Sequence, residues 1–242
     1  MLKYHVKDNE SHKTIIFITG AGVGKWMWQH QMNLPFNLVT FDLPGHGDNA
    51  DKDFESIAKT CNEIIKIIND LKLDKVILIG HSIGAQIILY MMENHSEYID
   101  KALVVSGLNQ PSKLMASMMK PTIAMTMPLI KNRSFSKLQA GTLSLPDYML
   151  DVYYEDSLKM SKRTLTNLLT QNQLFEFKGS TLNGDQVLFM YGSKEVKMIK
   201  KSAQKNQKLV PGSKLRVLGA GHGIPYEVMD EFNQSIIEFI RA

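Results

Sequence analysis

The sequence has one cysteine, few arginines and no long hydrophobic run. Cys61 is the only cysteine among 242 residues, so an intramolecular disulfide is impossible and a cysteine-based metal site is not expected. No apolar run approaches the ~20 residues that a membrane-spanning helix needs. The N-terminal stretch MLKYHVKDNESHK lacks the apolar core of a secretory signal. These absences predict a soluble, cytoplasmic protein with no stable membrane anchoring.

Positive charge is modest and comes mostly from lysine. The formal net charge is +4, and the arginines are Arg133, Arg163, Arg216 and Arg241. The chain has no basic stripe interleaved with aromatic residues, so no nucleic-acid partner is expected. Hydrophobic residues make up 44% and charged residues 21% of the chain, which is ordinary for a globular protein with a sizeable core. We expect a monomer or a homodimer.

The stretch from Val76 to Glu93, VILIGHSIGAQIILYMME, joins an apolar run to an apolar-faced helical pattern. A buried strand must therefore turn at once into a helix, with Ser82 at the bend. Gly80 and Gly84 flank Ser82 at two residues on either side, where a sharp turn brings backbone close to backbone. The pattern predicts a strained elbow that exposes the serine hydroxyl beside the free amide groups of a helix start. The alternative is an ordinary helix cap made by Ser82.

Short apolar runs alternate with helical patterns along most of the chain. This alternation predicts an α/β fold with a mainly parallel central sheet flanked by helices on both faces. The expected strands are 2–7 at an edge, 14–19, 37–41, 76–79, 101–106, 186–191 and 214–218. The expected helices are 54–71, 85–92, 195–208, 226–240 and a short one through 26–28.

The alternation breaks between Leu108 and Phe177, a stretch rich in methionine and proline with no strong strand signal. We interpret residues 108–178 as a helical cap, or lid, inserted into a core made of residues 1–107 and 179–242. Flexible methionine side chains suit a surface that adapts to apolar ligands, which makes Met115 and Met119 candidates for substrate contact. Simple packing between cap and core explains the methionines equally well.

A serine hydroxyl becomes a good nucleophile only when a base takes its proton. His222 is the candidate base, because it lies in the glycine-rich loop GAGHGIP directly after the last strand. Glu195 follows the strand 186–191 and is the candidate carboxylate that orients the imidazole. The alternative for Glu195 is a glutamate favoured by the dipole at a helix start. The expected order of catalytic residues is therefore Ser82, Glu195, His222.

Two backbone N–H groups are needed to hold an oxyanion. Ile83, the residue after the nucleophile, supplies one, and Ala21 in the Gly20-Ala21-Gly22 turn is the candidate for the other. Further candidates for substrate contacts are Gly20, Gly22, Trp26 and His81, together with the two methionines named above.

These motifs together resemble the α/β-hydrolase fold family, which includes serine esterases and lipases. The resemblance rests on GHSIG at 80–84, on the order Ser82, Glu195, His222, on the loop DLPGHG at 42–47, and on the insertion before the strand that leads to the acid. It implies a serine-histidine-acid catalytic triad, a sheet of the eight-stranded type and a helical cap. The chain departs from the family in having Thr19-Gly20 where His-Gly is usual, and glutamate where aspartate is usual.

The sequence leads to the hypothesis of a carboxylesterase. The substrate would be a small-molecule ester with a small to medium apolar acyl group, cleaved through an acyl-enzyme without cofactor or metal. A non-hydrolytic lyase of the same fold, similar to SHCHC synthase, and a small-ligand receptor are the alternatives. A nucleotide site at Gly20–Lys25 is disfavoured, because Trp26 stands where a P-loop needs Ser or Thr and Lys25 where a dinucleotide motif needs glycine.

Overall fold

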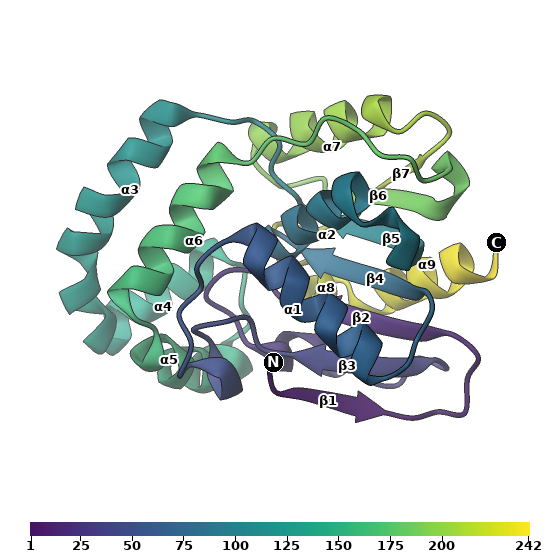
Figure 1. Cartoon of the computed structure of the whole chain (residues 1–242). Coiled ribbons are helices and arrows are strands. Elements are labelled where there is room, and N and C mark those ends of the chain that lie inside the picture. Colours follow the sequence, from purple (N-terminus) through teal and green to yellow (C-terminus); the bar gives the residue numbers. More distant parts are fainter.

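The computed structural model describes residues 1–242 as one sheet covered by helices on both faces (Figure 1). The predicted α/β architecture with a mainly parallel sheet is confirmed. The seven strands run in the order β1-β3-β2-β4-β5-β6-β7, and only β1 is antiparallel to its neighbour. Their bounds are β1 Tyr4–Lys7, β2 Thr14–Ile18, β3 Asn37–Phe41, β4 Val76–His81, β5 Ile99–Val105, β6 Val187–Gly192 and β7 Lys214–Leu218.

Nine α-helices complete the fold, and serine or asparagine caps begin several of them. Ser56, Ser112 and Ser161 each accept a hydrogen bond from a backbone N–H in the first helical turn, which satisfies one of the free donors there. The helices are α1 Ile57–Asp70, α2 Ile83–Asn94, α3 Lys113–Thr126, α4 Arg133–Thr142, α5 Leu150–Lys159, α6 Lys162–Leu174, α7 Lys197–Leu209, α8 Ile224–Glu227 and α9 Met229–Arg241.

Several expected elements differ in detail. The sheet has seven strands, one fewer than the eight-stranded type that the resemblance implied. The helix expected from residue 195 begins only at Lys197, so Glu195 lies on the loop before it. The helix expected over 226–240 is divided into α8 and α9, because Val228 has non-helical dihedral angles. The short helix around Trp26 is a 3₁₀ helix, η1 (Lys25–Gln31).

Successive side chains along each central strand point to opposite faces of the sheet, so the strands contribute to one hydrophobic core on each face. Ile16 and Leu78 pack toward α1 and α2, whereas Phe17 and Ile79 pack toward η1 and α9. A parallel sheet that is buried on both faces needs such continuous apolar strands, which is why β2 after Thr14 and β4 from Val76 to Ile79 are entirely apolar.

The strand order changes direction between the neighbouring strands β2 and β4. The strand after β2 in the chain, β3, lies on the side of β1, whereas the strands after β4, namely β5, β6 and β7, lie on the other side. η1 follows β2 on one face and α2 follows β4 on the opposite face. The carboxyl ends of β2 and β4 therefore leave a crevice between them, which is where open α/β sheets bind ligands.

The turn from β4 into α2 is sterically tight. A Cβ atom on Gly84 would lie 2.3 Å from the backbone oxygen of Ile18 in β2, and one on Gly80 would lie 2.5 Å from the backbone oxygen of Gly84. Ser82, between them, has φ 56° and ψ −115°, which is a strained combination for a residue with a side chain. Glycine at both flanking positions is thus what allows α2 to start directly against β2.

Helices α3 to α6 lie to one side of the sheet, and α3 is the outermost of them (Figure 1). These helices occupy the stretch predicted to be a cap, between β5 and β6. Buried side chains of α4 to α6 join the main cores, as Leu168 of α6 and Tyr153 of α5 show, whereas those of α3 do not. No helix combines the length and apolar character needed to cross a bilayer.

Replacing Gly84 with alanine tests the close approach of α2 to β2. Gly-to-Ala in a helix normally stabilises a protein by up to ~1 kcal/mol. Here the added methyl meets backbone, and overpacking of this kind costs about 1–3 kcal/mol, so Gly84→Ala should lower the free energy of unfolding in urea. Gly141→Ala in α4 is the matched control, because its Cβ would meet nothing within 4 Å. Equal effects of the two substitutions would contradict the steric explanation.

Candidate active site

A cavity of about 400 Å³ lies at the carboxyl ends of β4 to β7. Ser82 follows β4, Ser106 follows β5, Glu195 follows β6 and His222 follows β7, and all four line this cavity. Residues of the α3–α6 segment and its flanks form the opposite wall: Thr142, Ser144, Asn172 and Gln173. The sheet therefore brings together the three side chains that the sequence predicted as a triad.

Glu195 is buried, and its carboxylate accepts hydrogen bonds from three donors. Its Oε1 lies 2.6 Å from Nδ1 of His222, and its Oε2 accepts hydrogen bonds from the Ser106 hydroxyl (2.9 Å) and the Gly192 N–H (2.8 Å). A buried carboxylate is tolerated only when it is paired in this way. Since the carboxylate accepts, Nδ1 of His222 carries the proton, and Nε2 is left with a free lone pair. Such an imidazole is in the tautomer that can take up a proton from a hydroxyl.

Sequence reasoning missed Ser106. It directly follows the buried strand β5, adopts φ 56°, and donates its hydroxyl to Glu195 across the cavity floor. The signal was present, because Ser106-Gly107 ends an apolar strand at the same sheet edge as Ser82. By contrast, Asn109, also after β5, bonds to the Phe177 backbone and to Asn206 and takes no part in the site.

His81, the residue before Ser82, supports the loop that carries His222. Its Nε2 lies 2.6 Å from the backbone oxygen of His222, so this nitrogen is the protonated one and donates. The two imidazole rings are 4.6 Å apart between centroids. Burial, and secondarily the neighbouring His222, lowers the pKa of His81 to about 3. His81 is therefore neutral. It holds the backbone of His222 and is not in a position to act as the catalytic base.

The Gly20-Ala21-Gly22 turn lies beside Ser82. A Cβ on Gly20 would be 3.0 Å from Nδ1 of His81 and 3.5 Å from the Ser82 Cβ. The Gly22 N–H donates to Nε2 of His46, 3.1 Å away, whose Nδ1 bonds to the backbone oxygen of Pro44. The Ala21 N–H bonds to nothing in the protein.

On the other side of the crevice, the Ile83 N–H belongs to the first turn of α2, where backbone donors lack helical partners. The two N–H groups predicted to hold an oxyanion thus both remain available. His46, from the DLPGHG loop, accepts a hydrogen bond from Gly22 and so holds the turn that carries the Ala21 N–H.

None of the six predicted substrate contacts lines the cavity. Gly20, Gly22 and His81 lie in or beside the turn next to Ser82, whereas the other three lie farther along the chain on η1 and α3. The indole of Trp26 donates to Asp156 of α5, 2.8 Å away, and does not line the cavity. Met115 is 41% exposed and Met119 half-buried on α3, and neither lines it. The apolar side chains that do are Leu108, Val196, Met198 and Ile199. Helical periodicity could not reveal that the wall is made by the C-terminal ends of α4 and α6 and by Ser144 rather than by α3.

No hydrogen bond joins the Ser82 hydroxyl to the His222 ring, although both groups line one cavity. Bonds of this kind are often long in free enzymes and shorten when substrate is bound. In the loop Gly20–Lys25, where the sequence disfavoured a nucleotide site, Lys25 is paired with Asp42 (3.0 Å) and Asp48 (2.6 Å), so its charge is already neutralised by carboxylates.

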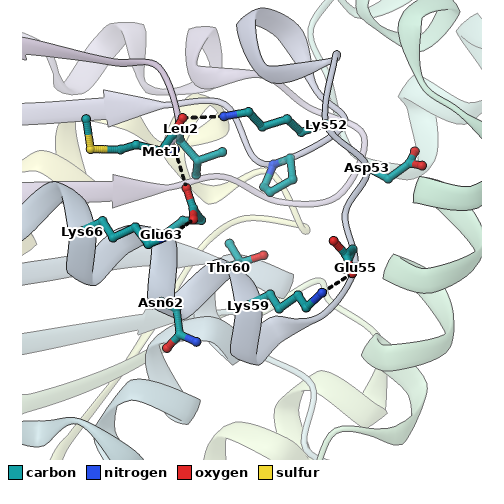
Figure 2. Close-up of a pocket in the computed structure, with 11 residues that line it drawn as sticks. Met1, Leu2, Lys52, Asp53, Glu55, Lys59, Thr60, Asn62, Glu63 and Lys66 are labelled. Carbon is teal, nitrogen blue, oxygen red and sulfur yellow. Dashed lines mark hydrogen bonds and ion pairs between the residues drawn. The ribbon is translucent and has the colours of Figure 1, made fainter.

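A larger cavity, of about 550 Å³, lies between the N-terminal segment and α1 (Figure 2). Most of its charged side chains already have partners: Lys59 bonds to Glu55, and Glu63 lies against both Lys66 and the N-terminal amine. It contains no histidine and no hydroxyl-base pair, so size alone does not mark the functional site.

The chain belongs to the alpha/beta hydrolase family, because the model of that family matches residues 15–235. Among curated proteins, it is 30% identical over 112 residues to "Putative carbamate hydrolase RutD" of Caulobacter sp. (strain K31), a match covering 44% of this chain. It is 34% identical over 114 residues to "Putative esterase/lipase 2" of Mycoplasma genitalium, again 44% of this chain. The chain spans 42% of the length of each of these relatives.

Solved structures resemble the whole chain. A thermophilic esterase from Thermogutta terrifontis superposes with a TM-score of 0.83, covering 99% of this chain and 93% of the other. Sequence identity in that pair is 14%, so the likeness shows the fold alone.

The depressed pKa of His81 makes a prediction about stability at low pH. An unfolded histidine titrates near 6.5, so between that value and about 3 the unfolded chain binds the extra proton. The contribution of neutral His81 is therefore present above pH ~6.5 and is lost as the pH falls. Between pH ~7 and ~5 this costs about 2 kcal/mol, and buried His46, whose pKa burial also lowers, acts in the same direction.

Urea unfolding at both pH values measures this loss in the wild type and in His81→Gln. The glutamine variant keeps a side-chain N–H but does not titrate, so its stability should fall less between the two pH values. An equal fall would show that His81 is not the source.

Proposed function

We propose that this protein is a serine hydrolase that cleaves carboxylic esters through an acyl-enzyme. The observation that carries the proposal is the chain of contacts from buried Glu195 to His222 in the cavity that also holds the strained Ser82. A hydroxyl, an imidazole in the accepting tautomer and a paired carboxylate are the groups that nucleophilic acyl transfer needs. Relatives named as an esterase/lipase and a carbamate hydrolase support a hydrolytic reaction at a carbonyl.

In the proposed mechanism, Nε2 of His222 takes the proton of Ser82 while Oγ attacks the ester carbonyl. The charge on the carbonyl oxygen is held by the N–H groups of Ala21 and Ile83. The Glu195 carboxylate stabilises the imidazolium, which then gives its proton to the departing alcohol. Water, deprotonated by the same imidazole, hydrolyses the acyl-enzyme and returns Ser82 to its starting state.

Small to medium acyl groups suit the cavity best. Its volume of about 400 Å³ is at the small end for ligand sites, and only four of its lining residues are apolar. A short acyl chain can lie against Leu108 and Ile199, whereas a long chain would leave apolar carbons against Ser144, Asn172 and Gln173. We therefore propose acetyl to butyryl esters as preferred substrates. We propose also that the α3–α6 segment is the cap that limits their length.

Hydrolysis of p-nitrophenyl acetate and butyrate tests the reaction. Wild type should release p-nitrophenol from both, and Ser82→Ala should lose about 10³-fold or more in kcat. Ser193→Ala is the control, since Ser193 is exposed and outside the cavity, and should match wild type. Turnover that survives in Ser82→Ala, or its absence in wild type together with tight ligand binding, would reject the esterase in favour of a lyase or a receptor.

Replacing Glu195 with glutamine tests the acid. An amide NH₂ group at the Oε2 position would face the Gly192 N–H, and at the Oε1 position it would force His222 to protonate Nε2 instead. The first arrangement sets two donors against each other and removes the charge that stabilises the imidazolium, and the second disables the base, so kcat should fall by about 10²–10⁴-fold while KM changes little. Glu176→Gln on the surface is the control. Steady-state kinetics of Glu195→Gln that match wild type would place the acid elsewhere.

A further inference from the structure

Helix α3 presents an apolar stripe to solvent. Leu114 is 73%, Met118 49% and Met125 72% exposed. Steps of four and seven residues place these three side chains on one side of a helix. The inner side of α3 is made by Ala116 and Ile123, which are buried. The exposed stripe therefore lies directly opposite the face that packs against α6, and it is not a frayed part of the core.

Lysines that form no ion pair lie beside this stripe. Lys113 and Lys120, seven residues apart, run along one edge of α3, and Lys131 and Lys137 follow in the next turns of the chain. All four are exposed and none forms an ion pair. Between Pro111 and Pro146 the sequence has no aspartate or glutamate, and the one further cation, Arg133, is paired with Asp151.

Nothing in the fold covers the stripe, since α3 is the outermost helix of its segment (Figure 1). Leu129, 45% exposed just beyond the end of α3, extends the apolar surface. Isolated exposed leucines are normal in proteins, but a row of apolar side chains bordered along one edge by charge of one sign is typical of an interaction surface.

We propose that the outer face of α3, formed by Leu114, Met118 and Met125 and flanked by Lys113 and Lys120, binds reversibly to an anionic lipid surface. A helix whose exposed face is apolar and edged by lysines can lie in the interface, with its apolar side chains among the acyl chains and its lysines at the headgroups. Both features are present on α3, and the lack of acidic residues removes repulsion from lipid phosphates. Such binding needs no spanning helix and does not depend on the proposed hydrolytic reaction.

Charge favours lipid over a second copy of this chain as the occupant. Two copies of α3 packed face to face and antiparallel would place their lysine edges on the same side, where like charges repel. The sequence offers no acidic residue on this surface to compensate. A bilayer containing anionic lipid supplies negative charge wherever a lysine lies, with each lysine near the surface strengthening binding about fivefold at moderate ionic strength.

Co-sedimentation of the full chain with vesicles tests this proposal. Vesicles of one part phosphatidylglycerol to two parts phosphatidylcholine should carry down the protein, and phosphatidylcholine vesicles should do so far less. The variant Leu114→Ser/Met118→Ser/Met125→Ser should lower the partition coefficient at least about tenfold. Lys113→Gln/Lys120→Gln should lower it by about fivefold per lysine, and salt should weaken the wild type more than this variant.

The matched control is Val217→Ser, which removes an exposed apolar side chain on β7 and should leave vesicle binding unchanged. All substituted side chains are exposed, and p-nitrophenyl acetate hydrolysis in free solution should be unaltered. The proposal would be overturned if wild type did not sediment with phosphatidylglycerol-containing vesicles, or if both α3 variants bound them as strongly as wild type. So would a wild-type dimer, measured by sedimentation without lipid, that the serine variant converts to monomer, because a second copy would then cover the stripe.

Discussion

The site depends on one close contact of backbone with backbone, where α2 starts against the end of β2. Gly84 admits this contact because any Cβ would collide with the Ile18 carbonyl. The contact forces Ser82 into a positive φ, which turns its side chain out of the sheet and into the cavity. It also places the first turn of α2, with the free Ile83 N–H, directly after the serine. A single steric requirement thus sets both the hydroxyl and the start of the helix beside it.

A second requirement is that a carboxylate buried under the cavity must be fully hydrogen-bonded. The loops after β5, β6 and β7 supply the donors Ser106, Gly192 and His222, so the Glu195 carboxylate ties three strand ends together. The extra methylene of glutamate is accommodated because Glu195 lies on a loop before α7 rather than within that helix. Stability and the orientation of the imidazole therefore depend on the same group, which leaves little freedom to vary it.

Much of this arrangement could be predicted from the sequence, for a physical reason. Parallel strands place all their carboxyl ends at one edge, so residues such as Ser82 and His222 that directly follow apolar runs must meet there. Ser106 was missed because a lone serine after a strand has no distinctive pattern. The bond from His46 to Gly22 joins two loops that no periodicity relates. The catalytic roles and the division into core and cap stay predictions.

The α3–α6 segment shows where pattern reasoning reaches its limit. Helix α3 has apolar residues on two opposite sides, so its sequence does not determine which side is buried. The structure puts the face with Ala116 and Ile123 inward and leaves Leu114, Met118 and Met125 in water. The inward face carries fewer apolar side chains than the outward one, so hydrophobic burial within the molecule does not explain the exposed row. The methionines predicted to line a pocket thus lie on a helix with a row of long apolar side chains pointing outward, which is the arrangement expected of a surface with a partner outside the molecule.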